Sequence, residues 1–455
     1  MKTEVAKEHR SFSSQVVGTL LARIVMAGAS VGTSLVVARW LGADALGAFA
    51  VLNVATIVAV QVGCAGMPLA STYFIAQERR NAPRVWANAL LFAFVVGSAL
   101  ALAIIGLAAT NAELFGDIPL AFVTIVALSI PFQLANLLAL HVLLGVEAVS
   151  RFNVLEAAAP LLIFLNSIVV LTLAGEELPA FLALNTAGAV ALTVLSMWTI
   201  RRSTENIEGA QRLRPDGELF RRMAGYSLKF YILTLAPVVL FRFDLLIVKY
   251  FRTWAEAGVY SVAAQVATML MLVPLAVSTV LFPRVAAEGD ASGEFACKVT
   301  RHAAFVMLLL CAMAVPLGFA LPAIYGADFT EASVQLFILL PGVFLIGIQS
   351  VLVQHLNATD RTNAIPLFWI TTLAVNIAIN LALVPRHGAR GAALSSTVSY
   401  ALIFLLVIWR FHVQTGKPLS AILLLNATEL RELFSFRRST PSSKLSSKSS
   451  TRAFP

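Results

Sequence analysis

Long apolar stretches separated by short polar turns dominate this chain. Stretches of about 20 apolar residues cross a bilayer as helices. Inside lipid the backbone must satisfy its own hydrogen bonds, and runs such as Ala87 to Ala109 are too long and too uniformly apolar for the strands of a membrane barrel. The pattern therefore predicts an all-α polytopic membrane protein. We place twelve spans, at residues 16–38, 48–75, 85–109, 118–145, 152–173, 180–200, 224–248, 257–283, 302–323, 332–356, 363–384 and 389–410.

One long polar interruption divides these spans into two sets of six. The C-terminal tail differs in character from the rest, because it joins a predicted amphipathic helix at 419–436 to a Ser- and Lys-rich end that we expect to be disordered. We therefore predict an N-terminal six-helix lobe at 1–200, an Arg-rich linker at 201–222, a C-terminal six-helix lobe at 223–411 and a tail at 412–455.

The two halves repeat each other weakly with an offset of 211 residues. Under this offset Val37-Ala38-Arg39 aligns with Val248-Lys249-Tyr250, and Gly47-Ala48-Phe49 aligns with Gly258-Val259-Tyr260. Because each half contains six spans, both halves enter the membrane in the same direction. The sequence therefore predicts parallel repeats, related by an axis along the membrane normal, with a substrate site at their interface.

The placement of charge sets the topology. Charged residues are only 13% of the chain, against about 25% in soluble domains. Of the 33 Lys and Arg residues, 17 lie on loops that share a side with the N-terminus, eight lie in the tail, and five lie on opposite loops. Positive residues mark the cytoplasmic side, so we expect both termini there. The net charge of +9 thus reflects topology, and we expect no nucleic-acid partner.

Arg23 is the clearest charged residue inside a span. At 100° per residue it shares one helix face with Ser30 and Ser34. A charge at mid-bilayer costs at least ~2.5–3.5 kcal/mol, so it usually faces a cavity or a partner. The alternative is an arginine that snorkels to the inner interface, but Arg23 lies about 12 Å from the start of its span. We predict that Arg23, Ser30 and Ser34 line a cationic cavity.

The seventh span carries Arg242 and Asp244, two positions apart. Such residues point in nearly opposite directions and do not pair within one helix. One of them is predicted to line a cavity, and the alternative is that both pair with other helices and only fix packing. Lys229, near the cytoplasmic end of this span, suits either snorkelling or a substrate entrance. Arginines at two depths suit an anionic headgroup that is handed across the membrane, because the guanidinium binds phosphate through two hydrogen bonds.

Other polar residues in the spans have less specific roles. Asp244, Glu156 and His141 are candidates for a titrating group in a coupling cycle or for a charge partner. The three cysteines have neither metal nor disulfide spacing, and we expect no metal and no cofactor. The amides in the spans are predicted to hold helices together. They are Asn53, Gln61, Gln133, Asn136, Asn166, Gln265, Gln349, Asn376 and Asn380.

Several motifs resemble a known family. The turn from Ala38 to Phe49, read as ARWLGADALGAF, resembles the start of the Wzx-like polysaccharide flippases of the multidrug/oligosaccharidyl-lipid/polysaccharide exporter superfamily. Further resemblances follow in the family's order and span most of the chain. They lie at 243–250, 257–263, 280–284, 325–329 and 383–393.

The resemblance implies a flippase that moves undecaprenyl-pyrophosphate-linked oligosaccharide to the outer leaflet, for O-antigen, capsule or exopolysaccharide synthesis. It implies alternating access between two six-helix lobes in the bacterial inner membrane, driven by an H⁺ or Na⁺ gradient. The implied partners are membrane lipids, the lipid-linked oligosaccharide, a polysaccharide polymerase and a chain-length regulator. The pyrophosphate would be the anion for Arg23 and Arg242, although neither lies in a family motif. With room for twelve helices, the chain departs from the lipid II flippases, which have two more.

Three alternatives stay open. A drug/cation antiporter of the same superfamily requires a cavity dominated by carboxylates, for which Glu156 is the main candidate in the first half. A membrane enzyme of polysaccharide assembly requires a catalytic loop, and the sequence contains no P-loop, HExxH, GxSxG or catalytic carboxylate pair. We therefore expect no enzyme activity. A non-transporting scaffold for glycan assembly would not need Arg23 beside a serine stripe.

Overall fold

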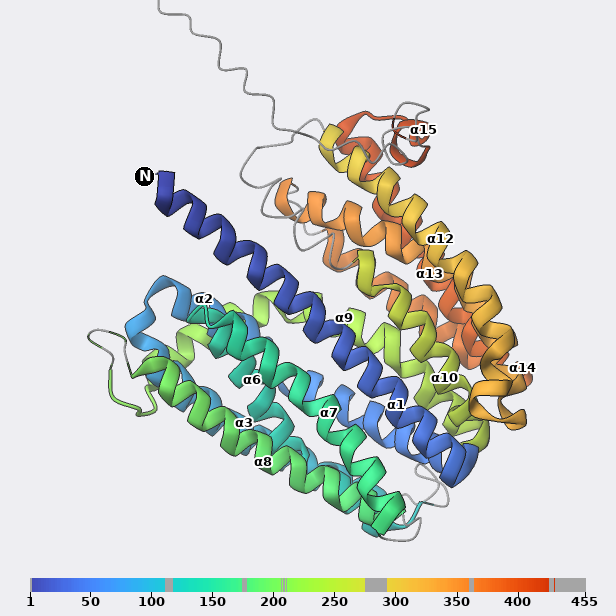
Figure 1. Cartoon of the computed structure of the whole chain (residues 1–455), viewed down its shortest axis with the longest axis horizontal. Helices are drawn as coiled ribbons and strands as arrows, with labels where there is room; N and C mark the ends of the chain where they lie inside the picture. The colour runs from blue at the N-terminus through green and yellow to red at the C-terminus, as the bar shows by residue number, and fades with distance from the viewer. Residues whose placement is uncertain are drawn as a thin grey trace, which may run out of the picture.

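The computed structural model describes residues 2–110, 118–173, 178–205, 207, 209, 211–274, 293–359, 364–424 and 429. Over these residues the regular structure is entirely helical, which confirms the predicted all-α class (Figure 1). The N-terminal half contains α1 (Lys2–Gly63), α2 (Met67–Gln77), η1 (Arg79–Asn81), α3 (Ala82–Thr110), α5 (Leu120–Ala127), α6 (Ile130–Gly145), α7 (Val149–Leu173) and α8 (Leu178–Thr204). The C-terminal half contains α9 (Gly217–Phe251), α10 (Trp254–Leu270), α12 (Glu294–Tyr325), η2 (Ala327–Phe329), α13 (Thr330–Thr359), α14 (Ala364–Thr415) and α15 (Leu419–Leu423).

Two long helices each cover two of the predicted spans. α1 bends at Gly42, with φ 82° and ψ −179°, and α14 bends at Gly388, with φ 58° and ψ −142°. A positive φ strains any residue with a Cβ, so glycine is the residue that turns the chain sharply without a loop. Nine helices of the described chain are long and apolar enough to cross a membrane. Counting α1 and α14 twice and adding the charged helix α9 accounts for the twelve predicted spans.

Two of those spans are not continuous helices. The span predicted at 48–75 breaks after Gly63, where Ala65 and Gly66 take a positive φ. The span predicted at 118–145 breaks between α5 and α6, at residues 128–129. In both cases a proline, Pro68 or Pro131, lies in the first turn of the helix that follows. Proline lacks the N–H that a continuing helix needs, so it restarts a helix more readily than it extends one.

Helices extend into both ends of the predicted linker and into the start of the predicted tail helix. α8 continues to Thr204 and α9 begins at Gly217, both within the linker predicted at 201–222. The helix predicted at 419–436 begins at the expected residue, because α15 starts at Leu419, but α15 ends at Leu423 and Leu424 is extended. The rest of that prediction falls outside the described residues except for Glu429. Its carboxylate accepts a 2.8 Å hydrogen bond from Arg301 Nε, which joins the tail to α12.

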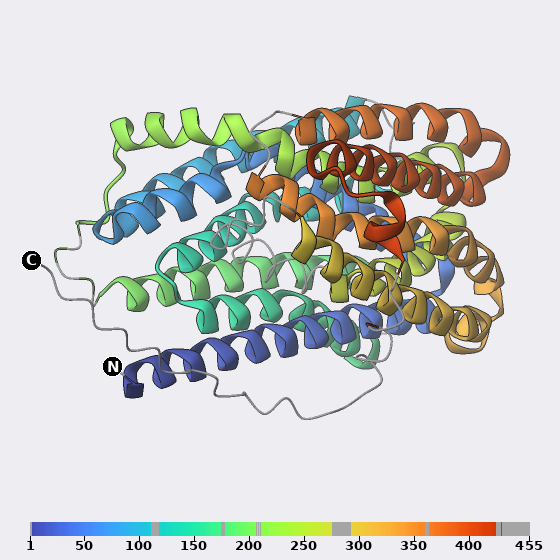
Figure 2. The ribbon, with the colours of Figure 1, turned by 90° about the horizontal axis from the view of Figure 1, so that it is seen from above.

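The helices form two groups with two helices between them (Figures 1 and 2). One group contains α2, α3 and α5–α8, the other contains α10 and α12–α14, and α1 and α9 run between them. The first part of α9 contacts the N-terminal group, where Tyr231 Oη donates a 2.7 Å hydrogen bond to Val62 O. Its later part packs on α14, where the Phe241 and Tyr400 rings lie 5.3 Å apart. Because α9 contacts both groups, the lobe boundaries stay a prediction.

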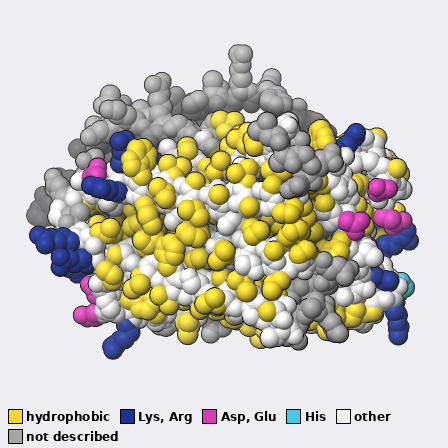
Figure 3. Space-filling view, turned by 90° about the horizontal axis from the view of Figure 1, so that it is seen from below, with side chains coloured by type: hydrophobic (Ala, Val, Ile, Leu, Met, Phe, Trp, Pro, Cys, Tyr) yellow, Lys and Arg dark blue, Asp and Glu magenta, His cyan; other side chains and the backbone are white. Residues whose placement is uncertain are grey.

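The surface matches a membrane environment. Apolar side chains cover the middle of the face in Figure 3, and charged side chains gather at its two ends. Leu102, Val154 and Phe319 are each 70% exposed, which water would penalise but lipid does not. We call the end at which α1 begins and α15 lies the terminus end, and the opposite end, which holds both glycine kinks, the distal end.

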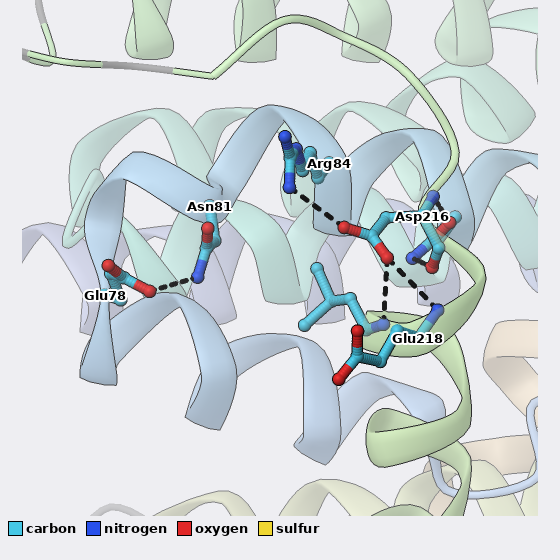
Figure 4. Close-up of polar contacts among 7 residues, drawn as sticks. Glu78, Asn81, Arg84, Asp216 and Glu218 are labelled. Atoms are coloured by element: carbon cyan, nitrogen blue, oxygen red, sulfur yellow. Dashed lines mark hydrogen bonds and ion pairs between the residues drawn. The ribbon is translucent and has the colours of Figure 1, made fainter.

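Asp216 fastens the linker to the N-terminal group at the terminus end (Figure 4). Its carboxylate caps α9 by accepting from the backbone N–H groups of Glu218 and Leu219, at 3.1 and 3.0 Å, and it pairs with Arg84 of α3 at 2.9 Å. Its backbone exchanges two hydrogen bonds with the Asn88 side chain, at 2.8 and 2.9 Å. The Leu219 N–H, followed by Arg84 and the Glu218 N–H, lowers the pKa of the Asp216 carboxyl.

We expect Asp216→Ala to lower the melting temperature of the purified protein by a few degrees at neutral pH, because it removes both the cap and the ion pair. The folded state depresses the pKa of Asp216, so its stabilisation is present above the ordinary aspartate pKa and is lost as pH falls through the depressed value. The difference in melting temperature between wild type and variant should therefore disappear at acidic pH. Glu218→Ala is the control, and an equal loss there, or a gap that ignores pH, would contradict the assignment.

Candidate functional site

Arg23 lies in a polar seam between α1 and α7. Its Nη1 is 3.0 Å from Oε1 of Glu156, and the Arg23 side chain is 42% exposed. One turn away, Asn153 Nδ2 donates a 3.0 Å hydrogen bond to Thr19 Oγ1. The other carboxylate oxygen of Glu156 is buried without a hydrogen-bond partner among the described residues. The candidate cation thus already has an anionic partner, and that partner retains an unused acceptor.

Asp244 and Arg242 face different surroundings, as the two-residue spacing predicts. Asp244 is buried and accepts hydrogen bonds from Tyr260 Oη of α10, from Ser396 Oγ of α14 at 3.0 Å and from its neighbour's N–H at 2.8 Å. Arg242 is partly buried and interacts electrostatically with Asp244 and Tyr400, but it makes no hydrogen bond or ion pair within the described chain. Asp244 therefore joins three helices, whereas no described residue accepts a hydrogen bond from the Arg242 guanidinium.

A second polar cluster, next to Ser396 in sequence, joins the two arms of α14. Asn376 Nδ2 donates to Ser399 Oγ at 3.1 Å, and Ser395 Oγ donates to Asn376 O at 3.1 Å. Asn380 Nδ2 donates to Asn376 Oδ1 at 3.1 Å, while the buried Asn380 Oδ1 has no partner among the described residues. The amides were predicted to hold helices together, but the serines gave no sequence signal, because single serines are common in membrane helices.

The remaining predicted residues are dispersed. Ser34 is buried and shares a 2.9 Å hydrogen bond with Tyr325 Oη of α12, whereas Ser30 is only partly buried. His141 Nδ1 lies 3.2 Å from Thr72 Oγ1, in the contact between α2 and α6. The Lys229 side chain lies outside the described residues. The structure thus pairs Arg23 with Glu156 and leaves these residues in separate contacts, and a single site made of all of them stays a prediction.

A contact between two glycines closes the distal end. A Cβ on Gly47 would overlap the Trp254 carbonyl oxygen, and a Cβ on Gly258 would overlap the Ala43 carbonyl oxygen. The two contacts are equivalent under the 211-residue offset, which places residue 43 on 254 and residue 47 on 258. The second arm of α1 and the start of α10 therefore meet backbone to backbone about a pseudo-twofold axis, as expected for the predicted parallel repeat.

Polar contacts surround this glycine pair. Asp44 Oδ1 accepts a 3.0 Å hydrogen bond from Ala255 N at the start of α10. Arg39 donates to the carbonyl oxygens of Ala323 and Ile324 at the end of α12, each at 2.7 Å. These contacts link the two halves through backbone groups left free at helix ends, which need partners wherever they are buried.

A charged vestibule of about 1280 Å³ lies at this distal closure. Within it Arg390 pairs with Glu331 at 2.7 Å, and Glu256 Oε1 accepts a 2.7 Å hydrogen bond from Ala389 N. Some of these residues thus already have partners, and their contacts link α10, α13 and α14. The charged and histidine lining residues of the vestibule are Asp44, Arg252, Glu256, Asp328, Glu331, Arg386, His387 and Arg390.

Comparison with known proteins defines the class. The model of the polysaccharide biosynthesis protein family matches residues 14–287, and the chain belongs to this family. The probable flippase AglR of Haloferax volcanii is 31% identical over 194 residues, which cover 39% of this chain and 40% of AglR. The probable low-salt glycan biosynthesis flippase Agl15 of the same organism is 24% identical over 169 residues, or 35% of each chain. The matches thus span less than half the length of either relative.

Solved structures share the fold. The lipid II flippase MurJ, in an inward closed conformation, superposes with a TM-score of 0.68 at 14% identity and covers 92% of this chain and 91% of its own. A multidrug resistance MATE family transporter, in an inward-facing conformation, superposes with a TM-score of 0.69 at 12% identity. The match covers 88% of this chain and 99% of the transporter. At these identities the likeness concerns the fold alone, and the family is shown by the matched model over residues 14–287.

We expect Gly258→Ala to force the distal closure apart, because the new methyl group meets the backbone of residue 43, which cannot rotate away. Overpacking of this kind costs ~1–3 kcal/mol. The measurement is the rate at which a membrane-impermeant maleimide labels Ile338→Cys, a residue of the distal vestibule, in a background without the native cysteines.

The matched control is Gly106→Ala in α3, where a Cβ would have no neighbour within 4 Å. Labelling should accelerate with Gly258→Ala and stay unchanged with Gly106→Ala. Equal labelling in all three proteins would show that the glycine pair does not control access.

Proposed function

We propose that this protein is a flippase, which carries a lipid-linked oligosaccharide across the membrane by alternating access. The observation that carries the proposal is the pseudo-symmetric contact of Gly47 with Gly258, which closes one end of the interface between two repeats. An interface sealed by small residues at one end separates by a rigid rocking of the repeats, without unfolding. The flippase names of the two Haloferax relatives support the same activity.

The substrate class follows from the cations. We propose an undecaprenyl-pyrophosphate carrier, because two phosphates suit two guanidinium groups at different depths. Arg242 has no hydrogen-bond partner among the described residues, so a phosphate would not have to displace one of them. Arg23 is paired with Glu156 on a half-exposed seam, and an arriving phosphate would compete for it with this carboxylate. Such an exchange keeps Arg23 paired in both states, which avoids a lone charge in the membrane.

The coupling of transport is assigned to Asp244. A buried carboxylate that is held by hydroxyl groups responds to protonation or to a bound Na⁺ by rearranging its hydrogen bonds. Since Asp244 joins α9, α10 and α14, such a rearrangement acts on the helix α10 that forms the distal closure. We propose that an H⁺ or Na⁺ gradient drives transport through this residue.

The proposed setting is the inner membrane of a bacterium, with both termini in the cytoplasm and the distal end outside. A polysaccharide polymerase and a chain-length regulator are the proposed partners, and the product would be an O-antigen, a capsule or an exopolysaccharide. A cation-coupled drug antiporter is the second candidate, favoured by two carboxylates, the buried Asp244 and the partly buried Glu156. An anionic lipid pyrophosphate fits the free Arg242 better than a cationic drug does.

We expect Arg23→Ala and Arg242→Ala each to slow flipping of a fluorescent polyprenyl-pyrophosphate oligosaccharide in proteoliposomes by tenfold or more, because each removes a phosphate contact. Arg202→Ala, in the last turn of α8, is the control for an exposed arginine and should flip at the wild-type rate. Normal flipping by both variants would reject the cationic site. No flipping by wild type under an imposed gradient would favour the antiporter or the scaffold.

We expect Asp244→Asn to abolish the response of flipping to an imposed gradient, because asparagine keeps the size of the side chain and cannot titrate. The assay applies a pH gradient and a Na⁺ gradient separately to the same proteoliposomes. Loss of acceleration by one gradient identifies the coupling ion. A variant that still accelerates normally under both would remove Asp244 from the coupling mechanism.

A further inference from the structure

A pocket of about 340 Å³ lies within the N-terminal half, apart from the cations described above. Its walls come from the second arm of α1 and from α5–α8 and their turns. It collects six amides of the first half, which lie far apart in sequence. These are Asn53, Gln61, Gln133, Asn136, Asn166 and Asn185. The hydroxyl groups of Thr56, Ser129 and Thr186 and apolar side chains complete the lining, in which no described residue is charged.

Some of these amides are held in place by one another and by the backbone. Asn166 Nδ2 donates to Asn185 Oδ1 at 2.9 Å, and Gln133 Nε2 donates to Ser129 Oγ at 2.8 Å. Asn136 accepts from Ser196 Oγ at 2.9 Å and donates to Ala189 O at 3.2 Å. Their orientation is therefore set before any ligand arrives.

Several groups nevertheless keep unused hydrogen-bonding capacity. Asn185 Nδ2 is buried and has no partner among the described residues. The Asn53 side chain and Asn166 Oδ1 likewise make no hydrogen bond to any described residue. A buried polar group without a partner is unfavourable, so the Asn185 Nδ2 donor favours a ligand in this pocket that accepts a hydrogen bond. The unused set contains donors and acceptors together.

We propose that this pocket binds one neutral sugar residue of the transported glycan. Each sugar hydroxyl both donates and accepts, which matches amides that offer both functions, and the apolar walls suit the C–H faces of a sugar ring. A cation would require carboxylates and an anion would require basic groups, and neither lines the pocket. A purely apolar ligand would leave the amides unpaired.

The inference rests on the proposed function, which it deepens by assigning a recognition site for the sugar. The volume lies at the small end of ligand pockets, which admits one ring and not a chain. At its edge, Gln61 Nε2 donates a 3.3 Å hydrogen bond to Thr234 O of α9. The pocket therefore adjoins α9, which runs between the two helix groups. The same helix carries Arg242, one of the two arginines proposed to bind the pyrophosphate of the carrier.

The first test fills the pocket. Gly188 of α8 lines it, and a Cβ there would lie 3.6 Å from Asn166 Nδ2, an ordinary contact, so Gly188→Ala should fold. Gly106→Ala, outside the pocket and with no neighbour within 4 Å of the new Cβ, is the control that should function normally. Gly188→Leu should occupy the space of the ligand. Flipping is compared for polyprenyl pyrophosphate with a disaccharide and for polyprenyl pyrophosphate without sugar. We expect Gly188→Leu to slow the sugar-bearing lipid by tenfold or more and to leave the bare lipid unchanged.

The second test removes hydrogen bonds. Asn166→Leu and Asn185→Leu should reproduce the selective loss, whereas Gln349→Leu, a buried amide of α13 outside the pocket, should not. Binding of free glucose, galactose, mannose and N-acetylglucosamine is measured separately, by their effect on the melting temperature in a detergent without a sugar headgroup. We expect at least one sugar to stabilise wild type and none to stabilise Gly188→Leu.

The outcomes separate the two proposals. Equal loss for the sugar-bearing and bare lipids, or no loss in the pocket variants, overturns the sugar site and leaves the flippase intact. If wild type flips neither lipid but binds a sugar that Gly188→Leu does not, the proposed function fails and the pocket stands. The absence of both flipping and sugar binding overturns both proposals.

Discussion

The close approach of Gly47 and Gly258 is the contact on which the rest of the structure depends. Two helices can exclude everything between them only where neither carries a side chain, and here each glycine faces the backbone of the other helix. Because lipid supplies no hydrophobic force between helices, close packing of small residues is a main source of association in a membrane. The contact is tight yet contains no large interlocking side chain, so the helices can separate as rigid bodies.

Polar groups inside the helix groups differ between the two halves, although the halves share a fold. The C-terminal half buries the Asp244 carboxylate among its helices and meets it with hydroxyl donors from two other helices. The N-terminal half instead pairs Arg23 with Glu156 and gathers uncharged amides into a pocket. The symmetric closure therefore joins two halves whose buried polar groups differ in chemistry.

Hydropathy predicted the number and order of the spans because each lipid-exposed crossing needs its own run of apolar residues. It misplaced the breaks at 64–66 and 128–129 because a break between buried segments leaves the average hydropathy unchanged. Hydropathy also did not reveal that α1 and α14 each continue through a glycine kink, at Gly42 and Gly388. A polar turn and a kink look alike in sequence, and only the backbone conformation at the glycine distinguishes them.

The sequence by itself determined the all-α membrane class, the twelve spans and the internal repeat, since these depend on local composition and spacing. It also located the unusual charges, because a charge inside a span is visible without any contact. Only the tertiary structure decided which partners those charges have, since Arg23 and Glu156 lie more than a hundred residues apart. It also decided that amides from separate helices form one pocket, because the rotation of each helix is set by packing against its neighbours and leaves no mark in the pattern of any single span.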